Sequence, residues 1–275
     1  MTSLYTALCV MGPLSRALMS KLTPDHLDSK NFPFFFCRKM DVACAPDILT
    51  MNLTHTGELG FLYYIPNEFA IHVYDAIIEA GKELGLKHCG YYAQRAVRIE
   101  KFLAYWGQDL DSFTTPVECM RDYRCKLDKK IPFIGREAIE DQRKNGIKRM
   151  FVMLLLQNTG LVEEHNSDVD PWPWGGEPIY RDGEFCGTVT TASYGFSLGQ
   201  QICLGFVQDL RGGINNPATY GVQEFKEFVM SGSYNVNIRG QMYPAEALLK
   251  PPKLPDKVSP KVGGIWNFIK HERFR

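Results

Sequence analysis

The chain has 275 residues, which is long enough for one large domain or for two ordinary ones with real cores. Basic and acidic residues balance at 31 each, so the formal net charge is zero. Nucleic acids and anionic membranes attract an excess of basic residues, and this balance therefore argues against both as partners.

The cysteines and the apolar runs narrow the class of protein further. The eight cysteines are scattered with no CxxC pair, which argues against a zinc site and favours reduced, buried thiols in an intracellular compartment. No stretch approaches the roughly 20 apolar residues of a membrane-spanning helix. The amino-terminal residues do not resemble a secretory signal, because no basic residue precedes Arg16, and they lack the arginine density of a mitochondrial presequence.

The first half of the chain predicts a mixture of helices and strands. The predicted strands cover residues 32–43, 48–54 and 61–65, and the predicted helices cover residues 11–23, 66–84, 91–107 and 136–146. The sequence THTGELG joins the last two strands as a hairpin connection. Gly85 is expected to cap the second helix.

From Arg149 onward the pattern predicts short strands. They cover residues 149–157, 177–191, 201–207, 225–232 and 234–248, with a two-residue hairpin turn at Asp182-Gly183. This half is predicted to be a small all-β unit, a barrel or a sandwich. Two segments differ from it: an acidic loop at 158–176 that ends in two tryptophans, and a tail at 250–275 rich in proline and lysine.

Glu58 is the strongest local candidate for a binding residue. It lies between Gly57 and Gly60, and a turn needs the glycines but not the glutamate. A carboxylate held there can accept two parallel hydrogen bonds from an arginine or from a heterocycle that presents N–H beside NH₂. The alternative is an ordinary solvated turn residue.

Two further groups allow both a functional and a structural interpretation. Arg95 and Arg98 share one helix face and could meet an anionic ligand, or they could form a solvated charged face. Trp172 and Trp174 could anchor a partner or fold back on the barrel. No G-x-S-x-G elbow or glycine-rich phosphate loop occurs, so the sequence selects no catalytic residue.

Several ordered motifs together resemble one family. They are CVMGPLSRALMSKL, NLTHTGELGFLYYIP, GYYAQRAVRIEKFLAYWGQDL, TPVEC, PFIGREAI and GEPIYRDGEFCGTVTTASYGFSLG. Over about residues 4 to 250 the chain is similar to the folate-binding aminomethyltransferase module of the glycine-cleavage T-protein, which also forms the carboxyl-terminal half of sarcosine and dimethylglycine dehydrogenases. Within the family, YIPNEFAIHVY and DVDPWPWGGEPIYRDG resemble the branch of pyruvate dehydrogenase phosphatase regulatory subunits.

The resemblance implies specific site residues. Glu58 aligns with the family glutamate that holds the pterin ring of tetrahydrofolate, and Arg98 and Tyr194 are implied as further cofactor-binding residues. For the regulatory branch, the acidic tryptophan loop is the implied partner-binding segment, through Asp168, Asp170, Trp172 and Trp174.

Two departures from the family pattern argue against catalysis. Gln94 stands where the T-protein helix has a folate-binding arginine, and Arg95 stands where it has an aspartate. The family's catalytic aspartate belongs to a segment upstream of the motifs found here. The resemblance therefore implies a carboxyl-terminal fragment of a longer polypeptide, with FAD only if an upstream domain exists in that polypeptide.

These observations predict an α+β fold. A partial aminomethyltransferase folate-binding domain is expected over residues 1–132, its carboxyl-terminal β-barrel domain over 133–250 and a tail over 251–275. The resemblance implies a regulatory subunit of mitochondrial matrix pyruvate dehydrogenase phosphatase that contacts the catalytic subunit. The alternatives are the tetrahydrofolate-binding half of a sarcosine or dimethylglycine dehydrogenase, and a remnant that binds nothing.

Overall fold

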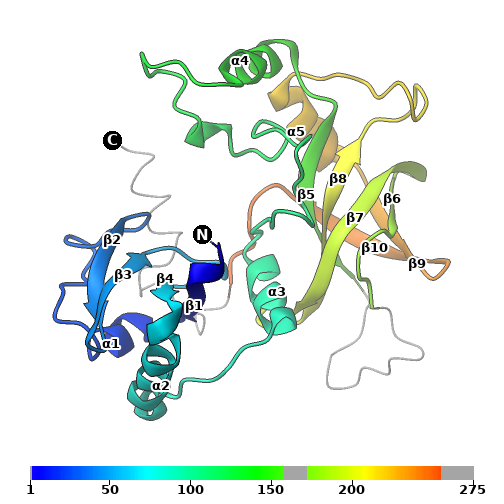
Figure 1. Ribbon diagram of the computed structural model, residues 1–275. Helices are drawn as coiled ribbons and strands as arrows, with labels where there is room; N and C mark the ends of the chain where they lie inside the picture. Colours follow the sequence, from blue (N-terminus) through cyan, green and yellow to red (C-terminus); the bar gives the residue numbers. More distant parts are fainter. Residues whose placement is uncertain (1, 158–171, 255–275) are drawn as a thin grey trace. The chain divides into compact units, whose positions relative to one another are not determined.

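The structure is a computed structural model that describes residues 2–157 and 172–254. Its described residues form two compact units, the first ending at Gln94 and the second beginning at Arg95 (Figure 1). Helices and a sheet make up the first unit, and a closed barrel dominates the second. The predicted α+β fold is confirmed.

The first unit is built on a four-stranded antiparallel sheet. Its strands are β1 (Tyr5–Met11), β2 (Cys37–Val42), β3 (Ala45–Met51) and β4 (Gly60–Pro66), in the order β1-β4-β3-β2. The predicted hairpin is confirmed, because β3 pairs with β4 across the THTGELG segment. β1 was missed by the sequence analysis, which treated these residues only as a possible signal segment.

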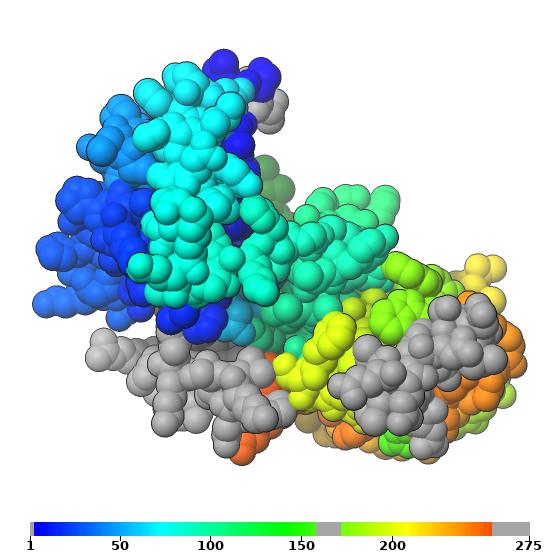
Figure 2. All heavy atoms as spheres, turned by 90° about the horizontal axis from the view of Figure 1, so that it is seen from below, coloured from blue at the N-terminus to red at the C-terminus, as the bar shows by residue number. Residues whose placement is uncertain are grey.

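Two helices cover one face of this sheet. They are α1 (Ser15–Met19) and α2 (Ala70–Gly81), and 3-10 turns lie at Thr2–Leu4, Asn67–Phe69 and Lys82–Leu84. Val73 and Ile77 of α2 pack with Phe61 and Tyr63 of β4 in one buried core. Gly85 ends the second helical segment with φ of 69°, as predicted. In Figure 2 the cyan residues that include α2 lie on the surface of the first unit.

Helix α3 (Tyr91–Glu100) is shorter than the predicted 91–107. Phe102 takes a left-handed φ of 55°, and the amides of Phe102 and Leu103 bond back to the carbonyls of Ile99 and Arg98. This is the hydrogen-bond pattern that ends many helices, usually at glycine. Phe102 replaces glycine here because its ring is buried and stacks on Phe151 at 5.3 Å.

The second unit contains a six-stranded closed barrel, as predicted. Its strands are β5 (Arg149–Leu156), β6 (Pro178–Arg181), β7 (Glu184–Gly195), β8 (Gln200–Gln208), β9 (Tyr234–Ile238) and β10 (Gln241–Leu248), in the order β10-β5-β8-β7-β6-β9. The Asp182-Gly183 hairpin is confirmed, with φ values of 52° and 88°. Helix α4 (Arg136–Asn145) and a 3-10 turn (Asp122–Arg124) precede the barrel in the chain.

The predicted strand at 225–232 is wrong, because these residues belong to helix α5 (Val222–Ser231). Phe225 and Val229 are its buried residues, and their spacing of four is the helical signal that the aromatic content concealed. Glu224 caps the helix by accepting a hydrogen bond from the Gly221 amide at 3.3 Å.

Strand β5 is buried on both faces, which explains its continuous apolar sequence. Val152 and Leu154 face the core inside the barrel, whereas Phe151 and Met153 belong to a second core with Ile99 of α3. The barrel wall is thereby joined to α3, which carries several of the candidate site residues.

Candidate functional site

The Glu58 turn is tied to the end of β1. The Thr56 amide donates to the Thr54 hydroxyl at 3.1 Å, and the Glu58 amide donates to the Thr56 hydroxyl at 3.4 Å. Both hydroxyls lie near the sulfur of Met11, at 3.9 and 3.7 Å. Glu58 is half-buried, and it lies in a turn whose shape its neighbours fix.

Glycine is required at the end of this turn. A Cβ atom at Gly60 would lie 2.9 Å from the Leu53 carbonyl oxygen, a distance that real Cβ atoms essentially never show. Gly57 has a φ of 77°. The two glycines on either side of Glu58 therefore have structural causes of their own, one conformational and one steric.

The sheet face opposite the helices is apolar beside this turn, except for Lys39 on the far edge strand β2. Strand pairing places Cys9, Leu62, Met51 and Cys37 in one row across the sheet. The next row contains Ala7, Tyr64, Leu49 and Lys39. Apart from Leu62, these side chains are exposed or half-buried. A carboxylate in a turn beside an apolar surface suits a planar heterocycle that has polar hydrogens on one side.

Arg98 lies in a buried network of the second unit. Its side chain forms an ion pair with Asp109 at 2.8 Å and donates to the Leu103 carbonyl at 2.7 Å. The second terminal nitrogen donates to Gln108 at 2.9 Å and to Thr191 at 3.3 Å. Each terminal nitrogen therefore makes two hydrogen bonds within the unit. The arginine holds the end of α3, the following loop and β7 together.

Asp109 was not found by the sequence analysis. It is 3% exposed and also accepts hydrogen bonds from the Tyr105 amide at 2.8 Å and the Thr190 hydroxyl at 2.6 Å. No helical or strand period links it to Arg98, because it lies in a loop. The only feature of the sequence that could have indicated this ion pair is an aspartate eleven residues after the arginine.

Tyr194 lies near the end of β7. It is 5% exposed, and its ring meets that of Phe196 edge-on at 5.3 Å. The turn after it is held by Glu100 of α3, which accepts hydrogen bonds from the amide and hydroxyl of Ser197. Glu100, which is 5% exposed, is thus a buried link between α3 and the turn after β7.

Arg95 holds the end of the tryptophan loop. Its guanidinium donates to the Trp174 carbonyl at 2.6 Å and lies 5.5 Å from the centre of the Trp174 ring. The amides of Trp174 and Gly175 both donate to Glu177, at 2.7 and 2.9 Å. Trp174 remains 54% exposed, and Trp172 is half-buried. Asp168 and Asp170 lie outside the described residues.

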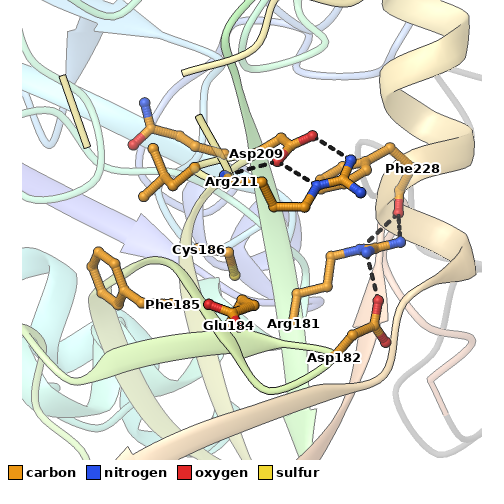
Figure 3. Close-up of a pocket in the computed structure, with 10 residues that line it drawn as sticks. Arg181, Asp182, Glu184, Phe185, Cys186, Asp209, Arg211 and Phe228 are labelled. Carbon is orange, nitrogen blue, oxygen red and sulfur yellow. Dashed lines mark hydrogen bonds and ion pairs between the residues drawn. The ribbon is translucent and has the colours of Figure 1, made fainter. Parts of the chain in front are cut away.

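Two adjoining clefts are present in the described part of the second unit. One, of about 250 Å³, lies at an end of the barrel between Arg181, Phe185 and Arg211 (Figure 3). Arg181 donates to the Phe228 carbonyl at 2.9 Å, with its guanidinium 4.0 Å from the ring centre of Phe228. The other, of about 420 Å³, lies beside Asp109. Neither is lined by Glu58, Tyr194 or Trp174.

Metal binding and membrane crossing find no support in the described residues. No group of three or more histidine, cysteine, aspartate or glutamate residues there could hold a metal ion. No helix within the described ranges has the length and apolar character needed to cross a bilayer. All eight cysteines are free. The expectation of buried thiols is correct for Cys119, Cys186 and Cys203 and wrong for the exposed Cys9, Cys37, Cys44 and Cys89.

Comparison with known proteins identifies the family. The GCVT N-terminal domain matches residues 1–129, and the glycine cleavage T-protein C-terminal barrel domain matches residues 159–253. The chain belongs to the glycine cleavage T-protein family. The T-protein domain matches leave residues 130–158 between them, whereas the compact units meet at Gln94 and Arg95. The predicted domain boundary at residue 132 stays a prediction.

Relatives in the T-protein family have several kinds of name. The chain is 41% identical to the mitochondrial pyruvate dehydrogenase phosphatase regulatory subunit of Mus musculus, over 90% of this chain and 27% of that protein. It is 34% identical to the mitochondrial sarcosine dehydrogenase of Homo sapiens, over 94% of this chain and 26% of that protein. It is 31% identical to the aminomethyltransferase of Halothermothrix orenii, over 74% of this chain and 53% of that protein. The chain thus spans about a quarter of the length of the first two.

A solved structure supports the T-protein fold. The glycine cleavage system aminomethyltransferase T from Bartonella henselae matches with a TM-score of 0.68 at 18% identity, over 91% of this chain and 61% of that one. At this identity the match establishes the fold alone. The resemblance found in the sequence is confirmed by these comparisons.

Proposed function

We propose that this chain is a regulatory module of mitochondrial pyruvate dehydrogenase phosphatase and acts by contact with the catalytic subunit in the matrix. The similarity to the mouse regulatory subunit supports this proposal, as do the mitochondrial relatives. The T-protein fold would then serve as a scaffold that binds a partner, with no turnover of its own.

The observation that carries the proposal is the anchored tryptophan. Trp174 exposes 54% of its surface while Arg95 and Glu177 hold its backbone in place. An aromatic side chain whose backbone is already fixed loses little conformational entropy on binding, and tryptophan is enriched among residues that dominate binding energy. Arg95, which departs from the family pattern, supplies one of these contacts.

The buried arginine network is consistent with a scaffold. Arg98 uses four donors within the protein, so we propose that its contribution to a ligand site is to position α3. Tyr194 and Glu100 lie in the same buried region of α3 and β7.

Surface plasmon resonance with the immobilised catalytic subunit tests the proposal. The Trp174→Ala variant should bind at least about tenfold more weakly than wild type, a loss of about 1.4 kcal/mol. Trp106→Ala is the matched control, because Trp106 is 65% exposed in the same unit. Equal affinity of Trp174→Ala and wild type, or failure of wild type to bind, would contradict the proposal.

A second candidate is tetrahydrofolate binding, which the Glu58 turn favours. We propose that Glu58 accepts the adjacent N–H groups of the pterin ring while the apolar sheet face beside it contacts the ring. Tetrahydrofolate, when bound, would accept a one-carbon unit, as in a sarcosine or dimethylglycine dehydrogenase. The half-buried carboxylate and its fixed turn suit this ligand.

Titration calorimetry with tetrahydrofolate tests this candidate. Glu58→Gln should weaken binding by more than about 1.4 kcal/mol, because the amide loses one acceptor and the charge. Glu68→Gln is the control, since Glu68 is exposed on the 3-10 turn before α2. No heat of binding with a folded wild-type chain would eliminate the folate candidate and leave the partner-binding proposal standing.

A further inference from the structure

An exposed apolar tip lies in the loop before α4. All eight residues from Asp128 to Gly135 are exposed. Ile131, Phe133 and Ile134 expose 76%, 38% and 104% of their surface. In Figure 1 this loop extends past the start of α4 and away from the barrel. Adjacent exposed apolar residues of this size typically mark an interaction site.

The tip has a defined shape. Arg136 donates from its side chain to the Lys129 carbonyl at 2.9 Å, and its amide donates to the Phe133 carbonyl at 3.3 Å. The same guanidinium pairs with Glu140 of α4 at 2.8 Å. Gly135 has φ of 89°, which allows the chain to turn into the helix. The three apolar side chains are therefore presented from a loop that is anchored at both ends.

Basic side chains flank the tip. Lys126, Lys129 and Lys130 are exposed, and none makes an ion pair with any residue that the structure describes. Interfaces pair apolar centres with rims of complementary charge. A partner surface that is complementary to this loop would therefore have an apolar pocket surrounded by acidic residues.

A protein surface fits better than a membrane. Asp128 lies within the loop, and Glu137, Glu140 and Asp141 are exposed on α4 beside it. Residues 126–145 carry six basic and four acidic side chains, so the four carboxylates offset most of the positive charge that an anionic bilayer would attract. A discrete pocket can accept three apolar side chains while the acids of α4 stay in solvent.

We propose that the loop at residues 126–135 is a docking element that inserts Ile131, Phe133 and Ile134 into an acidic-rimmed apolar pocket of the phosphatase catalytic subunit. This inference rests on the proposed function and names a second contact surface for the same partner. The lysines would speed association through long-range attraction, and the apolar side chains would slow dissociation.

The test measures binding kinetics of the full chain on the immobilised catalytic subunit. Ile131→Ser/Ile134→Ser should weaken binding at least tenfold, mainly through faster dissociation. Lys129→Glu/Lys130→Glu should slow association and reduce its dependence on salt. Ile214→Ser is the matched control, because Ile214 is 74% exposed elsewhere in the second unit. Circular dichroism melting curves should show that every variant is folded.

The outcomes separate this inference from the proposed function. Wild-type binding that the loop variants retain in full would overturn the docking element and leave the regulatory proposal intact. A wild type that does not bind the catalytic subunit would overturn both. Loop-dependent binding to vesicles of phosphatidylserine and phosphatidylcholine, with no effect on the phosphatase, would overturn the protein pocket in favour of a membrane.

Discussion

The hydroxyl oxygen of Tyr63 is buried in the first unit without a hydrogen bond, among the described residues, that would offset the loss of water. Tyr63 is 0% exposed, and its hydroxyl has no hydrogen-bond partner among the described residues. Burial raises the pKa of this hydroxyl well above its usual value. The ring contributes to the core beneath α2, but the hydroxyl loses its hydrogen bonds to water without a replacement.

Removing that oxygen should therefore not destabilise the protein. Tyr63→Phe is expected to leave the free energy of unfolding unchanged or to raise it by about 1 kcal/mol, as urea denaturation would measure. Tyr234→Phe is the matched control, because the buried Tyr234 hydroxyl donates to the Val229 carbonyl at 3.0 Å. The control should lose about 1 kcal/mol. A comparable loss in Tyr63→Phe would contradict the absence of a partner.

The residues of the candidate site differ in how far the sequence could predict them. Glu58 could be found locally, because a turn explains its neighbouring glycines but not its carboxylate. Arg98 could not be interpreted in the same way. Its partners Asp109 and Thr191 lie in a loop and on a distant strand, so only the tertiary fold distinguishes a buried ion pair from a solvated helix face.

At the scale of elements, a charged cluster ties the end of β8 to the approach of α5. Asp209 is 4% exposed and accepts hydrogen bonds from Arg211 at 2.6 and 2.9 Å and from the Tyr220 hydroxyl. Arg211 is the main cause of the lowered pKa of the Asp209 carboxyl. The same contacts raise the pKa values of Arg211 and Tyr220.

The lowered pKa predicts how stability depends on pH. The pKa of an aspartate in the unfolded chain is about 3.9. The contribution of the Asp209 carboxylate to the free energy of unfolding is therefore complete above that pH, and it is lost as the pH falls toward the pKa of the folded state. Asp209→Asn should lower the free energy of unfolding at pH 7, and its difference from wild type should shrink between about pH 4 and pH 2. Asp75→Asn, on the exposed face of α2, is the control. If the difference in the free energy of unfolding between Asp209→Asn and wild type stayed constant across that range, ionisation of Asp209 would be excluded as its cause.

The elements were predicted best where one kind of signal dominated. Strand β5 has a continuous apolar run, and α2 has apolar residues at regular spacing, so both were predicted correctly. Helix α5 was misassigned because its phenylalanines favour strands, while its helical state depends on packing of Phe225 and Val229 against the barrel core. The end of α3 was missed because phenylalanine, in place of glycine, takes the left-handed conformation at residue 102.

At the scale of the whole molecule, the barrel could be expected from the density of strand signals, but its closure could not. Closure depends on β9 pairing with both β6 and β10, and pairing partners cannot be read from strand propensity. The family resemblance supplied this information, because it carries a whole topology. The placement of Trp174 beside Arg95 could not be predicted either, because the two residues are 79 positions apart in the sequence.

The uneven distribution of thiols gives the chain a built-in chemical reporter. The four exposed cysteines all precede Arg95, and two of them, Cys9 and Cys37, lie at opposite edges of the apolar sheet face. In the second unit, burial raises the pKa of Cys119 to about 11 and that of Cys186 to about 12, so both stay protonated and unreactive near neutral pH. Alkylation followed by mass spectrometry would thus record when that sheet face becomes covered, without a single engineered residue.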